Sequence, residues 1–67
     1  MKSLTLNGKT VRYPDVDTLG ELVAQLGLRR EGIAVAVNDE VIPRARIDAF
    51  PLHDGDTVEI IVAVAGG

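Results

Sequence analysis

Two short runs of alternating apolar and polar residues flank the dipeptide Asn7-Gly8 near the start of the chain. Asn-Gly between such runs is the strongest short-range signal for a β-hairpin, because both residues tolerate positive φ. A two-residue turn there pairs Leu4 with Val11 across the two strands. Successive side chains of a strand point to opposite faces, so this register gives the hairpin one polar and one apolar face. The apolar face is predicted to consist of Leu4, Leu6, Val11 and Tyr13.

After residue 18 the apolar residues no longer alternate with polar ones but recur every three or four positions. Thr18 and Glu21 fit a capping box, in which each side chain accepts a hydrogen bond from the backbone N–H of the other residue. Gly27 stands where a left-handed C-terminal cap is expected. The sequence therefore predicts a helix over residues 19–26, with Gly20 inside its first turn. The apolar stripe of this helix has the i, i+3, i+4, i+7 spacing and consists of Leu19, Leu22, Val23 and Leu26.

The second half of the chain has the features of strands and turns. Pro43 cannot donate to a strand ladder, so it is expected to end any strand that precedes it. Asp-Gly-Asp is typical of a turn, and the β-branched stretch after it is the most strand-prone of the chain. The predicted elements are a strand over 33–37 buried on both sides, a brief edge strand at 41–42, an irregular stretch over 44–53, a turn at 54–56 and a strand over 57–64.

A chain of 67 residues has room for one domain. The helix must lie across one face of a single mixed sheet, because only that arrangement buries the apolar faces of both. We therefore expect an α+β fold of the β-grasp type, the architecture of ubiquitin. It should have four to five strands, with one main helix packed on one face. The domain spans residues 1–67 and ends in a flexible tail of about residues 64–67.

The composition argues against several classes of function. The chain has no cysteine and one histidine, so no disulfide, zinc–thiolate site or cysteine–histidine pair can form. A formal net charge of −3 argues against a nucleic-acid partner. The longest apolar run, residues 60–65, is too short to cross a membrane, and the N-terminus lacks the apolar core of a signal peptide. We expect a cytoplasmic protein that is a monomer when free and binds no metal ion, nucleic acid or membrane.

Some charged residues still need an interpretation. His53 follows an irregular stretch and is interpreted as a solvated surface histidine. Asp54 and Asp56 supply too few oxygen atoms for a calcium loop, so turn chemistry accounts for them. The pair Arg29-Arg30 is interpreted as solvated charge after the helix end. None of these residues predicts catalysis, and we expect a protein on which enzymes act, not an enzyme.

The chain closes on Val64-Ala65-Gly66-Gly67, directly after its most strand-prone stretch. One interpretation is a frayed terminus. The other is functional, because glycines without Cβ can thread a narrow channel in a partner and leave the terminal carboxylate open. That carboxylate ionises with a pKa of about 3.5 and resists attack until adenylation by ATP gives it a leaving group. Gly67 would then be the reacting residue, and Val64, Ala65 and Gly66 the threading segment.

Three segments together carry a family resemblance: residues 37–44, residues 52–60 and the Gly66-Gly67 end. With the hairpin, the Leu-rich helix and the length, they make the whole chain resemble the ThiS-type sulfur carriers of thiamine biosynthesis. The resemblance implies that a ThiF-like enzyme adenylates Gly67 with ATP, and that a persulfide donor then converts it to a thiocarboxylate. A ThiG-like thiazole synthase takes the sulfur. The carrier itself needs no permanently bound cofactor.

Two departures from the family pattern leave alternatives open. Ala65 stands where the family often has a longer polar residue, and Ile47 where it commonly has an aromatic one. The Ala65-Gly66-Gly67 ending also resembles molybdopterin-type carriers, although those are longer and tend to have prolines before the tail. A carrier for another sulfur pathway, a ubiquitin-like modifier joined to lysines, and a β-grasp binding module are further alternatives. The pathway, the acceptor and the role of Ala65 stay open at this point.

Strand alternation also predicts a docking surface. We expect the residues that face the helix to be Leu4, Leu6, Val35, Val37, Val58, Ile60 and Val62. The opposite face then carries Ala34, Ala36, Ile61 and Ala63 as an apolar strip, flanked by the polar hairpin strands and ending at the tail. Exposed apolar patches rimmed by polar groups often bind proteins. Four extended tail residues reach about 13 Å, so a partner on this face could hold the terminal carboxylate in its active site.

Overall fold

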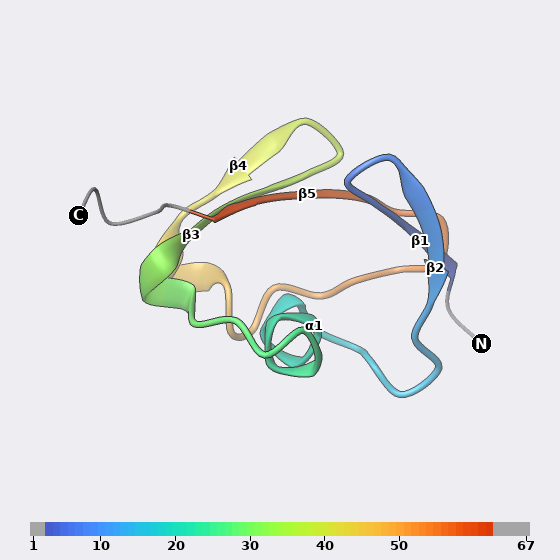
Figure 1. The fold of residues 1–67 in the computed structure, drawn as a ribbon, viewed down its shortest axis with the longest axis horizontal. Coiled ribbons are helices and arrows are strands. Elements are labelled where there is room, and N and C mark those ends of the chain that lie inside the picture. The colour runs from blue at the N-terminus through green and yellow to red at the C-terminus, as the bar shows by residue number, and fades with distance from the viewer. Residues whose placement is uncertain (1–2, 63–67) are drawn as a thin grey trace.

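The computed structural model describes residues 3–62, and within them a curved five-stranded sheet arches over a single α-helix (Figure 1). The strand order is β2-β1-β5-β3-β4, with β1 and β5 parallel and the other pairs antiparallel. The predicted mixed sheet with one main helix on one face is confirmed. The elements are β1 (Ser3–Leu6), β2 (Lys9–Arg12), α1 (Leu19–Gln25), η1 (Arg30–Gly32), β3 (Ile33–Val37), β4 (Glu40–Ile42), η2 (Arg44–Arg46) and β5 (Thr57–Val62).

The N-terminal hairpin forms as its sequence predicts. Asn7 and Gly8 have φ values of 49° and 83°, the positive values that a tight two-residue turn requires. Leu4 lies opposite Val11, in the predicted register. Leu4 is 1% exposed, and the other residues of the predicted apolar face pack against the core while partly buried. Asn7-Gly8 therefore predicted the turn correctly, and the alternation of apolar and polar residues predicted which face of the hairpin meets the core.

Helix α1 begins with the predicted capping box. The Glu21 N–H donates to Thr18 Oγ1 at 3.2 Å, and the Thr18 N–H donates to Glu21 Oε1 at 3.0 Å. The helix ends at Gln25, one residue earlier than predicted, and Gly27 follows with a φ of 70°. A left-handed glycine after the last turn gives its orphan carbonyls backbone partners. The same local signals that predicted the helix therefore also account for both of its ends.

Gly20 has a packing role in the first turn of α1. A Cβ added there would lie 2.7 Å from the Cα and the carbonyl oxygen of Asp48, well inside any tolerated contact. Glycine thus allows the segment around residues 47–50 to cross the helix at close range. Two backbone hydrogen bonds hold this crossing: Leu19 N–H donates to the Phe50 oxygen at 2.7 Å, and Leu52 N–H donates to the Asp17 oxygen at 2.9 Å.

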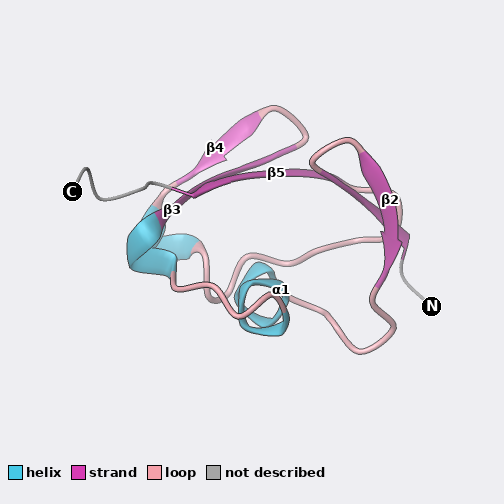
Figure 2. Ribbon diagram, viewed as in Figure 1, coloured by secondary structure: helices cyan, strands magenta, loops and turns pink. Residues whose placement is uncertain are grey.

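The core lies between the helix and the concave face of the sheet, with the segment over residues 44–53 packed beside them (Figure 2). That segment is irregular as predicted, apart from the short 3-10 helix η2. The buried apolar residues among those described are Leu4, Val16, Leu19, Leu22, Val23, Ile33, Val35, Val37, Ile42, Ile47, Leu52, Val58 and Ile60. The core is therefore entirely aliphatic over residues 3–62.

One prediction about burial is wrong, and a second residue is less covered than its face suggests. Strand β3 was predicted to be buried on both sides, but its residues alternate, and Ala34 is exposed while its neighbours Ile33 and Val35 are buried. Only one face of the sheet is covered by a helix, so only every second residue reaches the core. Val62 was predicted to face the helix, and it shares a face with its buried partner Ile33, but it is still 53% exposed. It pairs with Ile33 at the end of the sheet, and no described residue follows to cover it.

The sheet has two structurally distinct ends. At the end where β5 finishes, Val62 lies opposite Ile33, which directly follows η1. Strand β4 runs back toward the same end, because Ile42 lies opposite Val35, and η2 follows two residues later. Figure 2 shows both 3-10 helices at this end, below the last residues of β5.

In the described part of the chain, no helix is long and apolar enough to cross a membrane.

Candidate functional site

The predicted reacting residue, Gly67, and the predicted threading segment, Val64, Ala65 and Gly66, lie outside the described residues. The predicted mobility of this tail is therefore untested. The structure does place the point from which the tail leaves. Val62 is the last residue of β5 and pairs with Ile33 at the end of the sheet that carries η1 and η2. The described part of the chain therefore stops at this end of the domain, five residues before Gly67.

The outer face of the sheet carries the apolar strip that alternation predicts. Ala34 is exposed, Ala36 is partly buried, and Ile61 is 69% exposed. Ala63, the fourth member of the predicted strip, lies outside the described residues. The hairpin β1–β2 borders this strip on one side, next to β5, and β4 borders it on the other, next to β3. The strip itself is thus solvent-accessible, and its use as a docking surface stays a prediction.

Val41 belongs to the same surface, although sequence reasoning missed it. It lies opposite Ala36 in the β3–β4 pairing and is 75% exposed, the highest value among the large apolar residues described. Residues of β3, β4 and β5 line a hollow of about 140 Å³ on this face. Its lining residues are Ala34, Val35, Ala36, Val41, Glu59 and Ile61. Val41 could be assigned to this face only once the β3–β4 pairing was known, because residues paired directly across two strands share a face.

The side chain of Asn7 attaches the hairpin turn to β5. Its Oδ1 accepts from the Ile60 N–H at 2.8 Å, and its Nδ2 donates to the Ile60 oxygen at 3.2 Å. The β1–β5 ladder itself pairs only Thr5 with Thr57 and Leu6 with Val58. The amide of Asn7 therefore extends the hydrogen bonding where β1 has turned away. The sequence predicts Asn7 as a turn residue, but this second role depends on tertiary structure.

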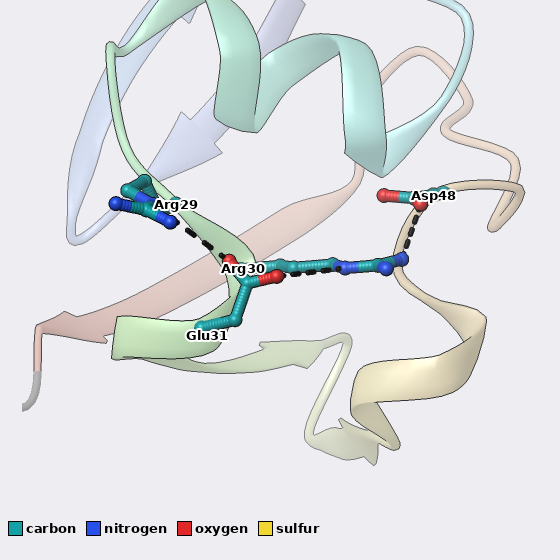
Figure 3. Close-up of polar contacts among 4 residues, drawn as sticks. All are labelled: Arg29, Arg30, Glu31 and Asp48. Carbon is teal, nitrogen blue, oxygen red and sulfur yellow. Dashed lines mark hydrogen bonds and ion pairs between the residues drawn. The ribbon is translucent and has the colours of Figure 1, made fainter.

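Arginines and carboxylates meet at the end of the sheet from which the tail leaves (Figure 3). Arg30 forms an ion pair with Asp48, and its Nε lies 3.5 Å from Glu31 Oε2. Arg29 Nε lies 4.0 Å from Glu31 Oε1, and its side chain is 87% exposed. Both arginines are exposed, as expected of solvated charge, but each also forms an ion pair, and Arg30 links η1 to the segment that crosses the helix.

Glu31 is held ionised by this arrangement. A hydrogen bond from its backbone lowers the pKa of the Glu31 carboxyl below its ordinary value, and the hydrogen bond and charge of Arg30 act in the same direction. The charge of Arg29 adds to the effect. Because all three side chains are substantially exposed, these pairs contribute little to stability. They place groups of both charges close together at this end of the sheet.

The acidic turn near His53 is structural, as predicted. Asp56 Oδ2 accepts from the His53 N–H at 2.8 Å, and Asp54 Oδ1 accepts from the Ser3 N–H at 2.7 Å. Gly55 between them has a φ of 88°, and His53 is exposed. The first bond closes the turn, and the second ties the turn to the start of β1. Among residues 3–62, no group of three or more histidine, cysteine, aspartate or glutamate side chains is arranged to hold a metal ion.

The fold is that of the ubiquitin-like β-grasp class. A mixed sheet packs over one helix, and the sequence after the last strand ends in Gly-Gly. Comparison with known proteins narrows this class. The model of the ThiS family matches residues 4–67, which include the Gly66-Gly67 end. A crystal structure of the thiamine biosynthesis protein ThiS from Geobacter metallireducens superposes with a TM-score of 0.79 and 34% identity, covering 97% of this chain and 99% of that one. The chain belongs to the ThiS family.

Curated relatives agree with this assignment. The sulfur carrier protein ThiS of Thermus thermophilus is 36% identical over 62 residues, covering 92% of this chain and 95% of that protein. The Escherichia coli protein of the same name is 30% identical over 64 residues, covering 96% of this chain and 97% of the relative. A thiazole synthase of Paramagnetospirillum magneticum is also 30% identical over 64 residues. That match covers 96% of this chain but 20% of the larger protein.

Proposed function

We propose that this chain is a sulfur carrier of thiamine biosynthesis and that it carries sulfur on the carboxyl group of Gly67. The observation that carries the proposal is the extent of the family match, which runs through Gly67 and spans nearly the whole length of two proteins named sulfur carrier protein ThiS. The position of Val62 supports it, because β5 ends at the edge of a small domain with five residues of sequence still to follow. The alternative pathways have no comparable support.

The chemistry follows from the properties of a terminal carboxylate. As an anion it resists nucleophiles, so it must first attack the α-phosphorus of ATP, releasing pyrophosphate and forming an acyl-adenylate. The terminal sulfur of a persulfide then attacks the carbonyl carbon and displaces AMP. Reduction of the remaining S–S bond by a second thiol leaves a thiocarboxylate on Gly67. Glycine at positions 66 and 67 suits these steps, because without Cβ the carbonyl carbon stays open to attack.

These steps require partner enzymes. We propose a ThiF-like adenylating enzyme that binds the ATP, a persulfide donor, and a ThiG-like thiazole synthase that takes the sulfur. The thiazole synthase has support from the comparisons, since a segment similar to nearly all of this chain makes up a fifth of one protein with that name. This chain is then a co-substrate that presents Gly67 to each enzyme in turn.

We further propose that the outer face of the sheet docks the adenylating enzyme. Ile61 and Val41 are exposed there beside a shallow apolar hollow, and β5 runs from this surface to the tail. Apolar groups exposed together, with polar groups around them, are typical of protein interfaces. The tail follows within two residues of Ile61, so docking on this face places Gly67 within reach of an active site.

The direct test changes the end of the chain and leaves residues 3–62 untouched. Deletion of Gly67, or addition of one alanine after it, should abolish ATP–pyrophosphate exchange by the cognate adenylating enzyme. Gly66→Ala should reduce exchange, because it adds a Cβ where the channel is expected to be narrow. All three variants should melt at the temperature of the unmodified protein. Full exchange by the extended protein would exclude Gly67 as the reacting residue.

A further inference from the structure

Four of the seven basic residues of the chain gather at the end of the sheet from which the tail leaves. Arg29 and Arg30 come with η1, and Arg44 and Arg46 form the two ends of η2. We call these four residues the arginine end. The strand pairing brings the two helices to the same end of the sheet. Strand β4 runs antiparallel to β3, so the chain leaves β4 near the start of β3, where η1 lies. Arg30 and Arg44 line one open hollow with Glu31 and Ala45.

The arginine end is locally positive in a chain of net charge −3. The two carboxylates of the same segments, Glu31 and Asp48, are both already paired with Arg30. Over residues 3–62 no ion pair engages Arg44 or Arg46, and both are exposed. The Arg44 guanidinium is therefore available at this hollow, and the Arg46 guanidinium is available at a second hollow that also includes Ala45. A guanidinium is weakly hydrated and presents a planar set of donors, which matches the geometry of a carboxylate.

The short length of the tail limits how far a partner that binds Gly67 can lie from this surface. Five residues separate Val62 from the end of the chain, and five extended residues span at most about 17 Å. Val62 lies opposite Ile33, the residue that follows η1. An enzyme that holds Gly67 in its active site must therefore have part of its surface close to the arginine end. Opposite charge on that surface would speed association and orient the domain as the tail enters.

We propose that the arginine end recognises acidic side chains on the enzyme that adenylates Gly67. The inference rests on the proposed function, since it takes that enzyme as the partner. Carboxylates fit better than nucleic-acid phosphates, because the charge is confined to one end of an acidic domain and would not follow an extended polyanion. The fold also contains an example of this recognition, since Arg30 binds Glu31 and Asp48 within the chain.

The test compares two double charge reversals that change the net charge equally. R44E/R46E alters the arginine end at residues with no described ion pair, and K9E/R12E alters exposed residues of β2 at the opposite edge of the sheet. We expect R44E/R46E to raise the KM for the carrier in ATP–pyrophosphate exchange about tenfold at low salt, with kcat nearly unchanged. K9E/R12E should change KM less than about twofold, and added salt should reduce the difference between the two variants.

Each other outcome overturns the inference. Unchanged kinetics for R44E/R46E would show that the arginine end does not contact the enzyme, and an equal rise in KM for both variants would assign the effect to net charge. Tight binding of a duplex RNA that only R44E/R46E removes, with exchange kinetics unaltered, would assign the surface to nucleic acid. If the unmodified chain supports no exchange, the proposed function fails first, and the inference about this enzyme falls with it. Thermal melting of both variants checks that the fold is intact.

Discussion

The two faces of the sheet carry similar side chains in different surroundings. Ile60 and Ile61 are neighbours on β5, yet Ile60 is 7% exposed and Ile61 is 69% exposed. Ile60 points toward the helix and joins the aliphatic core, whereas Ile61 lines the outer hollow with Val41. Burial of one such side chain contributes roughly 1.5 to 3 kcal/mol to folding. Only the inner isoleucine makes a contribution of that size.

The comparison separates stability from interaction. A small domain buries little surface, so each inner residue matters to the free energy of unfolding. The outer residues could be polar without harm to the core, and β1 and β2 show this, because their outer side chains are polar. Apolar side chains on the outer faces of β3, β4 and β5 therefore point to a role outside folding. Substitutions on the two faces should have effects of different kinds.

The largest effect is expected from placing one charge on each face. Ile60→Asp buries a carboxylate in the core and should cost several kcal/mol, enough to unfold a domain of this size. Ile61→Asp should change the free energy of unfolding by less than about 0.5 kcal/mol, because its side chain stays in water. Urea denaturation of both variants measures the difference. In exchange assays, Ile61→Asp should raise the KM for the carrier.

This pair of variants also tests the assignment of the faces. If Ile61→Asp unfolds the protein while Ile60→Asp is tolerated, the inner and outer faces of β5 are inverted. If Ile61→Asp leaves both stability and the KM for the carrier unchanged, the outer face does not dock the adenylating enzyme.

A smaller effect is expected from adding a methyl group on the helix side. Gly20→Ala should destabilise the domain by about 1 to 3 kcal/mol, because the new Cβ would lie 2.7 Å from the backbone of Asp48. Gly32→Ala is the matched control, since nothing lies within 4 Å of a Cβ there and its φ is not in the left-handed region. It should be neutral or stabilise by up to about 1 kcal/mol. Equal melting temperatures for the two variants would contradict the close crossing over α1.

The smallest effect concerns the attachment of the hairpin to β5. Asn7→Gly keeps a residue that tolerates positive φ but removes both hydrogen bonds to Ile60, and should cost about 1 kcal/mol. Asp39→Gly is the control, because Asp39 has a φ of 70° in the β3–β4 turn and none of the described side-chain hydrogen bonds involves it. It should be neutral or slightly stabilising. A larger loss for Asp39→Gly in urea denaturation would contradict the role given to Asn7.

Local signals predicted most of the fold. Asn7-Gly8 determines a two-residue turn, and Thr18 with Glu21 determines a helix start, through interactions within a few residues of the chain. Burial at the ends of elements could not be predicted in this way. The exposure of Val62 depends on where the helix and the 3-10 segments stop covering the sheet, which alternation alone does not specify.

The same distinction between local signals and tertiary structure applies to the candidate site. Gly66-Gly67 could be singled out from the sequence, because the chemistry needs only a terminal carboxylate without a neighbouring side chain. Val41 and the arginine end were missed, because both depend on the antiparallel return of β4 along β3. That pairing brings Arg44 beside Arg30, although the two residues lie far apart in the sequence.

The central claim is that Gly67 carries sulfur, and the intact mass of the protein taken from its native cells tests it most directly. The account predicts a population whose mass is raised by the replacement of one oxygen atom by one sulfur atom. Fragmentation should place that exchange on Gly67, and the population should disappear in cells that lack the adenylating enzyme. If the chain is found only with an unmodified carboxylate, or in isopeptide linkage to lysines of other proteins, the sulfur-carrier account is contradicted.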